Sequence, residues 1–141
     1  MLYPLIRPLL FRLNPEEIHG FTLKYLRSFH KLGFSRFFSA PVYAPCTVMG
    51  LKFPNRVGLA AGFDKNGDCI EGLFQLGFGF LEVGTVTPVA QAGNPKPRLF
   101  RIAGKKAIIN RMGFNNLGVE YLVSKLKISN AVTVRRRLCG K

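Results

Sequence analysis

The chain has 141 residues, 48% of them hydrophobic, which is enough for one folded domain with a buried core. Its formal net charge of +14 is unusual, but six of the basic residues and none of the acidic ones lie in residues 125–141. Three cysteines without a CxxC pair, and two histidines without partners at ligand spacing, argue against a disulfide framework and a zinc site.

A strongly basic chain can bind nucleic acid, an anionic membrane surface or anionic substrates. We expect no nucleic-acid partner, because the sequence has neither a known binding module nor a basic stripe with interleaved aromatic residues. The alternative is that scattered, solvated charges and a basic tail produce the net charge without any anionic partner. We also expect neither a signal peptide nor a transmembrane helix, because Pro4, Arg7, Pro8 and Arg12 interrupt the N-terminal apolar stretch.

Two short helices are predicted at the N-terminus. Residues 2–13 form the first, with a proline near its first turn, where a missing N–H costs little. Asn14 to Glu17 is typical of a second helix start, with Asn14 as the cap, Pro15 at the first position and Glu17 completing a capping box. A mostly apolar face then recurs at helical spacing until Gly33, the predicted stop. It consists of Ile18, Phe21, Thr22, Tyr25, Leu26, Phe29 and Leu32.

This apolar face, extended by Phe34, Phe37 and Phe38, has two interpretations. It can pack against the rest of the domain. It also has the composition of a helix that lies in a membrane interface, because basic residues surround a Phe- and Leu-rich surface. The proline-rich residues 41–45 then end the helical pattern and act as a linker.

Strands and turns follow the linker. Residues 48–53 and 55–57 are predicted to form a hairpin around Pro54-Asn55. The remaining elements, in chain order, are a short apolar strand at 58–61, a helix at 68–76 ended by Gly77-Phe78-Gly79, a strand at 80–87, a loop at 88–97, extended pieces at 98–102 and 107–109, and an amphipathic helix from 116 to about 127.

A strand, a helix and a second strand in this order predict a βαβ unit with a parallel sheet. Parallel strands buried on both faces are short and apolar, as these are. In such folds the chemistry lies at the carboxyl ends of the strands, where this sequence places Lys65 and Thr85.

Two segments have the composition of binding loops. Residues 60–67 combine small residues with Asp64 and Lys65, and their N–H groups can face a ring or a phosphate. Residues 110–116 combine amides, a guanidinium, a glycine and an aromatic ring, which suits a small, flat, anionic ligand. The alternatives are a surface Lys65 paired with Asp64, a Thr85 that is only a strand former, and an Asn116 that caps the following helix.

The sequence contains no Ser-His-Asp set and no carboxylate dyad, and five acidic residues in the central segment are too few for a metal cluster. Side chains that position and polarise without making bonds imply a cofactor that carries the chemistry.

Three motifs resemble one family closely, the membrane-associated, quinone-dependent (class 2) dihydroorotate dehydrogenases. They are NPEEIHGFTLKYL at 14–26, the long run from Val48 to Ile102 that contains GLAAGFDKNGD, and AIINRMGFNNLGVEYLV at 107–123. The resemblance covers residues 1 to about 127. It implies an α/β fold, the N-terminal part of a TIM (β/α)8 barrel, preceded by a two-helix apolar segment for membrane and quinone access.

The resemblance divides the chain into residues 1–40, the helical membrane- and quinone-associated segment, residues 46–127, the first part of an FMN-binding barrel, and a divergent basic tail at 128–141. The family oxidises dihydroorotate to orotate with FMN and a quinone in pyrimidine biosynthesis. Its members lie peripherally on a membrane, and the absence of a presequence favours the cytoplasmic face of a bacterial inner membrane.

The implied site residues follow from the matching motifs. The flavin would contact Ala61, Gly62, Phe63, Asp64, Lys65 and Thr85, and the orotate would contact Lys65, Asn110, Arg111, Met112, Gly113 and Phe114. His19 and Arg101 would lie near the quinone. No residue of this sequence matches the catalytic base of the class, a serine expected beyond residue 141, and no metal is implied.

The tail departs from the family pattern after Lys127, and we interpret it as the product of a frameshift or a truncated gene. A barrel of this kind needs about 250 residues. We therefore expect the product alone to bind FMN weakly or not at all, to aggregate and to lack turnover. The alternative functions are a small basic module that binds membranes or nucleic acid through its tail, and a remnant without function.

Overall fold

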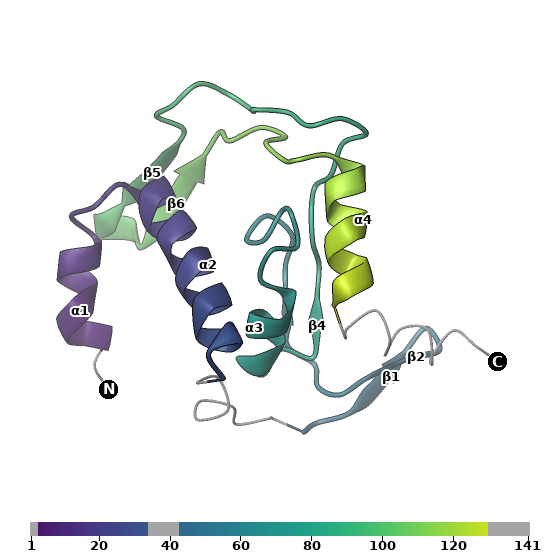
Figure 1. The fold of residues 1–141 in the computed structure, drawn as a ribbon. Coiled ribbons are helices and arrows are strands. Elements are labelled where there is room, and N and C mark those ends of the chain that lie inside the picture. Colours follow the sequence, from purple (N-terminus) through teal and green to yellow (C-terminus); the bar gives the residue numbers. More distant parts are fainter. Residues whose placement is uncertain (1–2, 34–42, 130–141) are drawn as a thin grey trace.

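The structure is a computed structural model that describes residues 3–33 and 43–129 (Figure 1). The predictions for Phe34, Phe37, Phe38, residues 41–42 of the linker, Cys139 and the tail from residue 130 lie outside these residues.

The two predicted N-terminal helices are present. They are α1 (Tyr3–Leu10) and α2 (Pro15–Lys31). The Asn14 side chain caps α2 by accepting a hydrogen bond of 2.9 Å from the backbone N–H of Glu16. Gly33 ends the helix as predicted, with φ of +75° and an N–H that donates to the carbonyl of His30. Within the described residues, the predicted capping bond from Glu17 does not form.

The prediction of a hairpin around Pro54-Asn55 is wrong. The hairpin consists of β1 (Cys46–Val48) and β2 (Leu51–Phe53), paired antiparallel, and it turns at Met49-Gly50. Both turn residues have positive φ, +50° and +78°, which matches the right-handed twist of the flanking strands.

Asn55 has a tertiary role instead of a turn role. Its side chain is 5% exposed, donates to the carbonyl of Gly77 and accepts from the N–H of Val57, each over 2.9 Å. It therefore joins the exit of the hairpin to the turn that follows the next helix.

The predicted βαβ unit forms around α3 (Ile70–Gln75). The strands β3 (Gly58–Leu59) and β4 (Phe80–Leu81) pair in parallel, with Gly58 opposite Phe80 and Leu59 opposite Leu81. Both strands are shorter than predicted. Backbone bonds continue the ladder beyond them, from Gly79 N to Val57 O at 2.8 Å and from Glu82 N to Leu59 O at 2.9 Å.

The rest of the described chain forms a hairpin and a helix. β5 (Leu99–Ile102) pairs antiparallel with β6 (Ala107–Asn110) across the short 3-10 turn Ala103–Lys105. The predicted loop before β5 is present and arches over the structure in Figure 1. The amphipathic segment becomes α4 (Val119–Ile128), so it starts three residues later than predicted. α2 lies on one side of α3, and α4 lies beyond β4 on the other (Figure 1).

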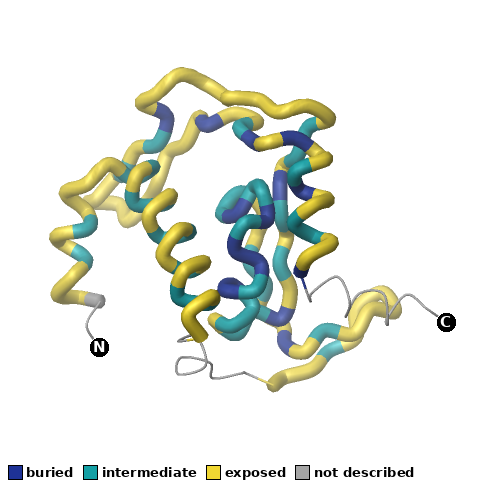
Figure 2. Tube along the Cα trace, viewed as in Figure 1, coloured by how far each residue is buried: buried dark blue, intermediate teal, exposed yellow. Residues whose placement is uncertain are grey.

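The buried residues gather around α3 and its neighbouring segments (Figure 2). The buried hydrophobic side chains are those of Cys69, Ile70, Leu73, Met112 and Leu122. α2 contains no buried residue, although its predicted apolar face is present. The described residues thus confirm an α/β fold and one parallel βαβ unit, which is part of the expected barrel. None of the described helices combines the length and the hydropathy that crossing a bilayer requires.

Gly79 offers a test of this packing. A Cβ at Gly79 would lie 2.5 Å from the backbone oxygen of Asn55, and this contact cannot be relieved by a side-chain rotation. We expect Gly79→Ala to lower the free energy of unfolding by about 1–3 kcal/mol through overpacking. Urea denaturation followed by circular dichroism measures the change.

Gly104→Ala is the matched control, because a Cβ added at Gly104 would have no atom within 4 Å and the φ of Gly104 is not in the left-handed region. It should be neutral or slightly stabilising. Equal stability of the two variants would contradict the packing described here.

Candidate functional site

Lys65 joins the two predicted binding loops. It follows β3, and its Nζ donates to the side-chain oxygen of Asn115 over 2.6 Å and to the carbonyl of Gly113 over 3.0 Å. The side chain is half-buried, and burial lowers the pKa of Lys65, with the positive charge of Arg98 adding to the effect. An ammonium has three N–H donors, and these two bonds use two of them. The third can bind an anionic ligand.

The Asp64 carboxylate shapes the turn that carries this lysine. It is 3% exposed, and its two oxygens accept from the backbone N–H groups of Asp68 at 2.9 Å and Cys69 at 2.7 Å. The alternative of a surface Lys65 paired with Asp64 is therefore wrong. Gly67 fits here because its φ is +69° and a Cβ would lie 2.9 Å from the Leu122 side chain.

The small residues beside Lys65 leave backbone atoms that no side chain covers. Gly62 has φ of +103°, and a Cβ added there would meet no atom within 4 Å. Its N–H donates to the carbonyl of Gly84 over 2.9 Å. Ala61 and Thr85 are exposed in the loops that follow β3 and β4. This arrangement of exposed backbone, a hydroxyl and an ammonium fits a flat ring that carries hydrogen-bonding atoms.

Asn116 organises the second loop from inside the protein. It is 5% exposed, its Oδ1 accepts from the N–H of Gly118 over 2.8 Å, and its Nδ2 donates to Phe114 O over 2.6 Å and to Thr87 Oγ1 over 2.9 Å. The alternative in which Asn116 caps the following helix is wrong, because Gly118 occupies the cap position of α4. Asn116 instead ties the loop after β4 to the loop after β6.

The other predicted ligand residues of this loop have different surroundings. Asn110 ends β6 and is exposed, as is Phe114, which is 60% exposed. The guanidinium of Arg111 donates to the carbonyl of Pro97 over 3.2 Å. Met112 is 8% exposed and belongs to the core.

A buried ion pair that the sequence patterns did not predict supports this loop. The Arg98 Nη2 lies 2.7 Å from the Glu16 carboxylate, with the two side chains 9% and 15% exposed. Arg98 also donates to the carbonyl of Asn94, whose side chain donates to Arg111 O over 2.7 Å. The pair joins the start of α2 to the loop before β5. Glu16 and Arg98 are 82 residues apart, so no local pattern signals the contact.

His19 and Arg101 both join the N-terminal helices to the rest of the chain. The Nε2 of His19 lies 2.6 Å from the carbonyl oxygen of Phe63, in the loop after β3. Arg101 donates to the carbonyl of Leu13 over 2.7 Å and lies over the Phe11 ring at 4.7 Å. No contact joins His19 to Arg101 within the described ranges.

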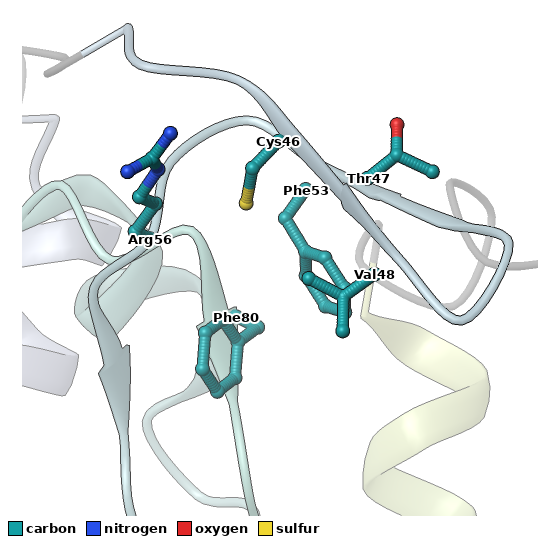
Figure 3. A pocket seen from close by; sticks show the side chains of 6 residues that line it. All are labelled: Cys46, Thr47, Val48, Phe53, Arg56 and Phe80. Atoms are coloured by element: carbon teal, nitrogen blue, oxygen red, sulfur yellow. The ribbon is translucent and has the colours of Figure 1, made fainter.

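A hollow of about 540 Å³ lies away from these loops (Figure 3). It is lined by Cys46, Thr47, Val48, Phe53, Arg56 and Phe80. It therefore lies beside the β1–β2 hairpin at the start of β4, away from the loops after β3 and β4 that carry Lys65 and Thr85. We place the candidate site at the loops, where the polar groups converge. Within residues 3–33 and 43–129, no three side chains are grouped as metal ligands.

Comparisons with known proteins identify the family of the chain. The family model of dihydroorotate dehydrogenase matches residues 43–136. Two curated relatives, from Marinomonas sp. (strain MWYL1) and Acinetobacter baylyi, are named dihydroorotate dehydrogenase (quinone). Each is 60% identical to this chain over 127 residues. The matches cover 89% and 90% of this chain, but only 37% of each relative.

The fold has a solved counterpart. The crystal structure of the Eimeria tenella dihydroorotate dehydrogenase in complex with ferulenol matches with a TM-score of 0.70 and 38% identity. The match covers 88% of this chain and 31% of the solved chain.

The Glu16–Arg98 pair makes the stability of the protein depend on pH. The hydrogen bond from Arg98 lowers the pKa of Glu16 below its ordinary value of 4.5. The stabilisation is therefore fully present above about pH 4.5 and is lost as the pH falls through the lower, folded-state pKa. We expect Glu16→Gln to cost about 1–3 kcal/mol at pH 7, with a smaller cost at pH 3.

Thermal unfolding of both proteins across this pH range measures the difference. Glu120→Gln is the control, because Glu120 is an exposed residue in the first turn of α4. A Glu16→Gln cost that does not change with pH would contradict the ion pair.

Proposed function

Because this chain belongs to the dihydroorotate dehydrogenase family, we propose that its two loops form the N-terminal part of a flavin- and pyrimidine-binding site. The enzyme of this proposal oxidises dihydroorotate to orotate in pyrimidine biosynthesis, with FMN as the cofactor and a membrane quinone as the acceptor. The chain spans little more than a third of the length of the curated relatives it matches, so their whole activity enters here as a proposal.

One observation carries the proposal, the contact of Lys65 with Gly113 and Asn115. It brings together segments that are 48 and 50 residues apart, and these are the two segments whose composition predicts ligand binding. In this class of fold, ligands bind beyond the carboxyl ends of the parallel strands, which is where Lys65 joins the two segments.

For the flavin, we propose contacts with Ala61, Gly62, Phe63, Lys65 and Thr85. The exposed backbone around Gly62 allows a flat ring to approach closely, because no side chain occupies that space. Both oxygens of the Asp64 carboxylate accept hydrogen bonds within its own turn, so we assign it the role of holding Lys65 in place. FMN, when bound, would accept the hydride from the substrate.

For dihydroorotate and orotate, we propose Lys65 together with residues 110–114. The Lys65 ammonium would face the substrate carboxylate, whose negative charge would offset the cost of keeping this lysine charged while half-buried. The amide of Asn110 and the backbone around Gly113 would bond the ring edge. Met112 would contribute through its backbone, because its side chain lies in the core.

For the quinone and the membrane, we propose the N-terminal helices. Large apolar side chains are exposed on α1 and α2, at Leu5, Leu9, Phe21 and Tyr25, with Arg7 and Lys24 beside them. This composition suits peripheral binding to a membrane surface. We propose the cytoplasmic face of a bacterial inner membrane as that surface. His19 and Arg101, which attach these helices to the loops, are the proposed quinone residues. We propose the corresponding division of the chain into residues 1–40, 46–127 and 128–141.

A chimeric enzyme tests the proposal. Residues 1–127 of this chain would replace the matching part of the Marinomonas sp. relative, so that the whole length of that relative is restored. We expect the chimera to bind FMN and to reduce a soluble quinone with dihydroorotate. Lys65→Met should lower kcat/KM about 100-fold or more, because a positioned charge at the ligand is lost.

Lys105→Met is the matched control in the chimera, because Lys105 is exposed in the turn between β5 and β6. It should leave kcat/KM within about twofold of the parent. A folded, FMN-containing chimera whose activity survives Lys65→Met would contradict the proposed site.

A further inference from the structure

Three residues of α2 form a stripe that contacts the loop carrying Lys65. They are His19, Leu23 and Arg27, and we call them the clasping stripe. They follow one another at intervals of four residues, so they lie along one face of the helix over about 12 Å.

Each member of the clasping stripe contacts residues 63–69, and the rings of His19 and Phe63 also lie 5.1 Å apart. The Nε2 of His19 lies 2.6 Å from Phe63 O, the carbonyl of Leu23 accepts from Cys69 Sγ over 2.8 Å, and Arg27 lies 3.6 Å from the Asp68 carboxylate. A carbonyl only accepts hydrogen bonds, so His19 must carry its proton on Nε2.

The Cys69 thiol is held as a donor in this arrangement. Burial raises the pKa of Cys69 to about 11, and the nearby carboxylates of Asp64 and Asp68 add to the effect. The thiol is therefore protonated at neutral pH and can donate to the carbonyl of Leu23. Its side chain is 3% exposed, so its reactivity reports on whether α2 stays on the loop.

The same loop is held on its other side by the segment that follows β6. Lys65 bonds to Gly113 and Asn115, the side-chain oxygen of Asn66 accepts from Leu117 N over 2.9 Å, and Asp68 accepts from Tyr121 OH over 2.8 Å. The loop is thus fixed between α2 and the 113–121 segment. A shift of α2 would therefore move the loop relative to the 113–121 segment.

We propose that the clasping stripe sets the position of Lys65, with His19 as a positioning residue that acts through the carbonyl of Phe63. The inference rests on the proposed function for its meaning, because α2 is the helix proposed to meet the membrane and the quinone. A displacement of α2 would then change the position of the Lys65 ammonium relative to the substrate, because α2 contacts both ends of the loop that carries Lys65.

The test uses the full chain without ligand, in a Cys46→Ser, Cys139→Ser background that leaves Cys69 as the single thiol. Two rates are measured by peptide mass spectrometry, the alkylation of Cys69 and the acetylation of Lys65. We expect His19→Leu to raise both about five- to tenfold, because the loop loses a hydrogen bond to α2. His19→Gln, which keeps a donor near the Nε2 position, should restore both rates to within about twofold.

Two controls separate positioning from a general loss of stability. Ser28→Leu places the same apolar side chain at an exposed position of α2 and should leave both rates unchanged. Amide hydrogen exchange in β5 and β6 should also stay unchanged in His19→Leu, because global unfolding would accelerate it together with the two labelling rates.

Three results would overturn the proposal. The first is unchanged labelling of both residues in His19→Leu. The second is a faster Cys69 reaction with an unchanged Lys65 reaction, which would mean that α2 does not position the lysine. The third is an increase in labelling that His19→Gln fails to reverse, or that is accompanied by faster amide exchange in β5 and β6.

The same variants in the chimera separate this inference from the proposed function. If both hold, His19→Leu raises the Kd for orotate about fivefold and His19→Gln restores it. If no variant binds FMN or orotate while the labelling pattern holds, the proposed function fails and the clasp stands.

Discussion

The hydrogen bonds of the Lys65 ammonium hold the candidate site together. Together with the bond from Leu117 N to Asn66, they join the loop after β3, which belongs to a parallel βαβ unit, to the loop after β6, which follows an antiparallel hairpin. With them, two segments of unrelated secondary structure share one cation. Two of the three ammonium donors are used by the protein, and the third is available to an anion.

Buried polar side chains keep that arrangement rigid. Asp64 fixes the turn before α3, Asn116 joins the loop after β4 to the loop after β6, and Glu16 with Arg98 attaches the start of α2 behind them. Each of these groups is nearly removed from water, so losing a partner would leave each with an uncompensated desolvation cost. The small apolar core around Leu73 alone does not position the loops.

Local chemistry was enough to predict the helices and the parallel strand pair, because caps, periodicity and short apolar strands act over a few residues. It failed at the hairpin, where Pro54-Asn55 has strong turn propensity but Asn55 is used by a contact with Gly77. Composition was enough to single out the two candidate binding segments. Their meeting through Asn115, and the support from Glu16 and Arg98, depend on contacts across 50 and 82 residues, which no local pattern carries.

A double-mutant cycle tests the central contact most directly. The free energy of unfolding of the chain is measured for Lys65→Met, for Asn115→Ala and for the pair. A contact between a charged donor and an amide oxygen at 2.6 Å predicts a coupling energy of about 1–3 kcal/mol. Additive effects, with coupling below about 0.3 kcal/mol, would mean that the two loops do not meet through Lys65.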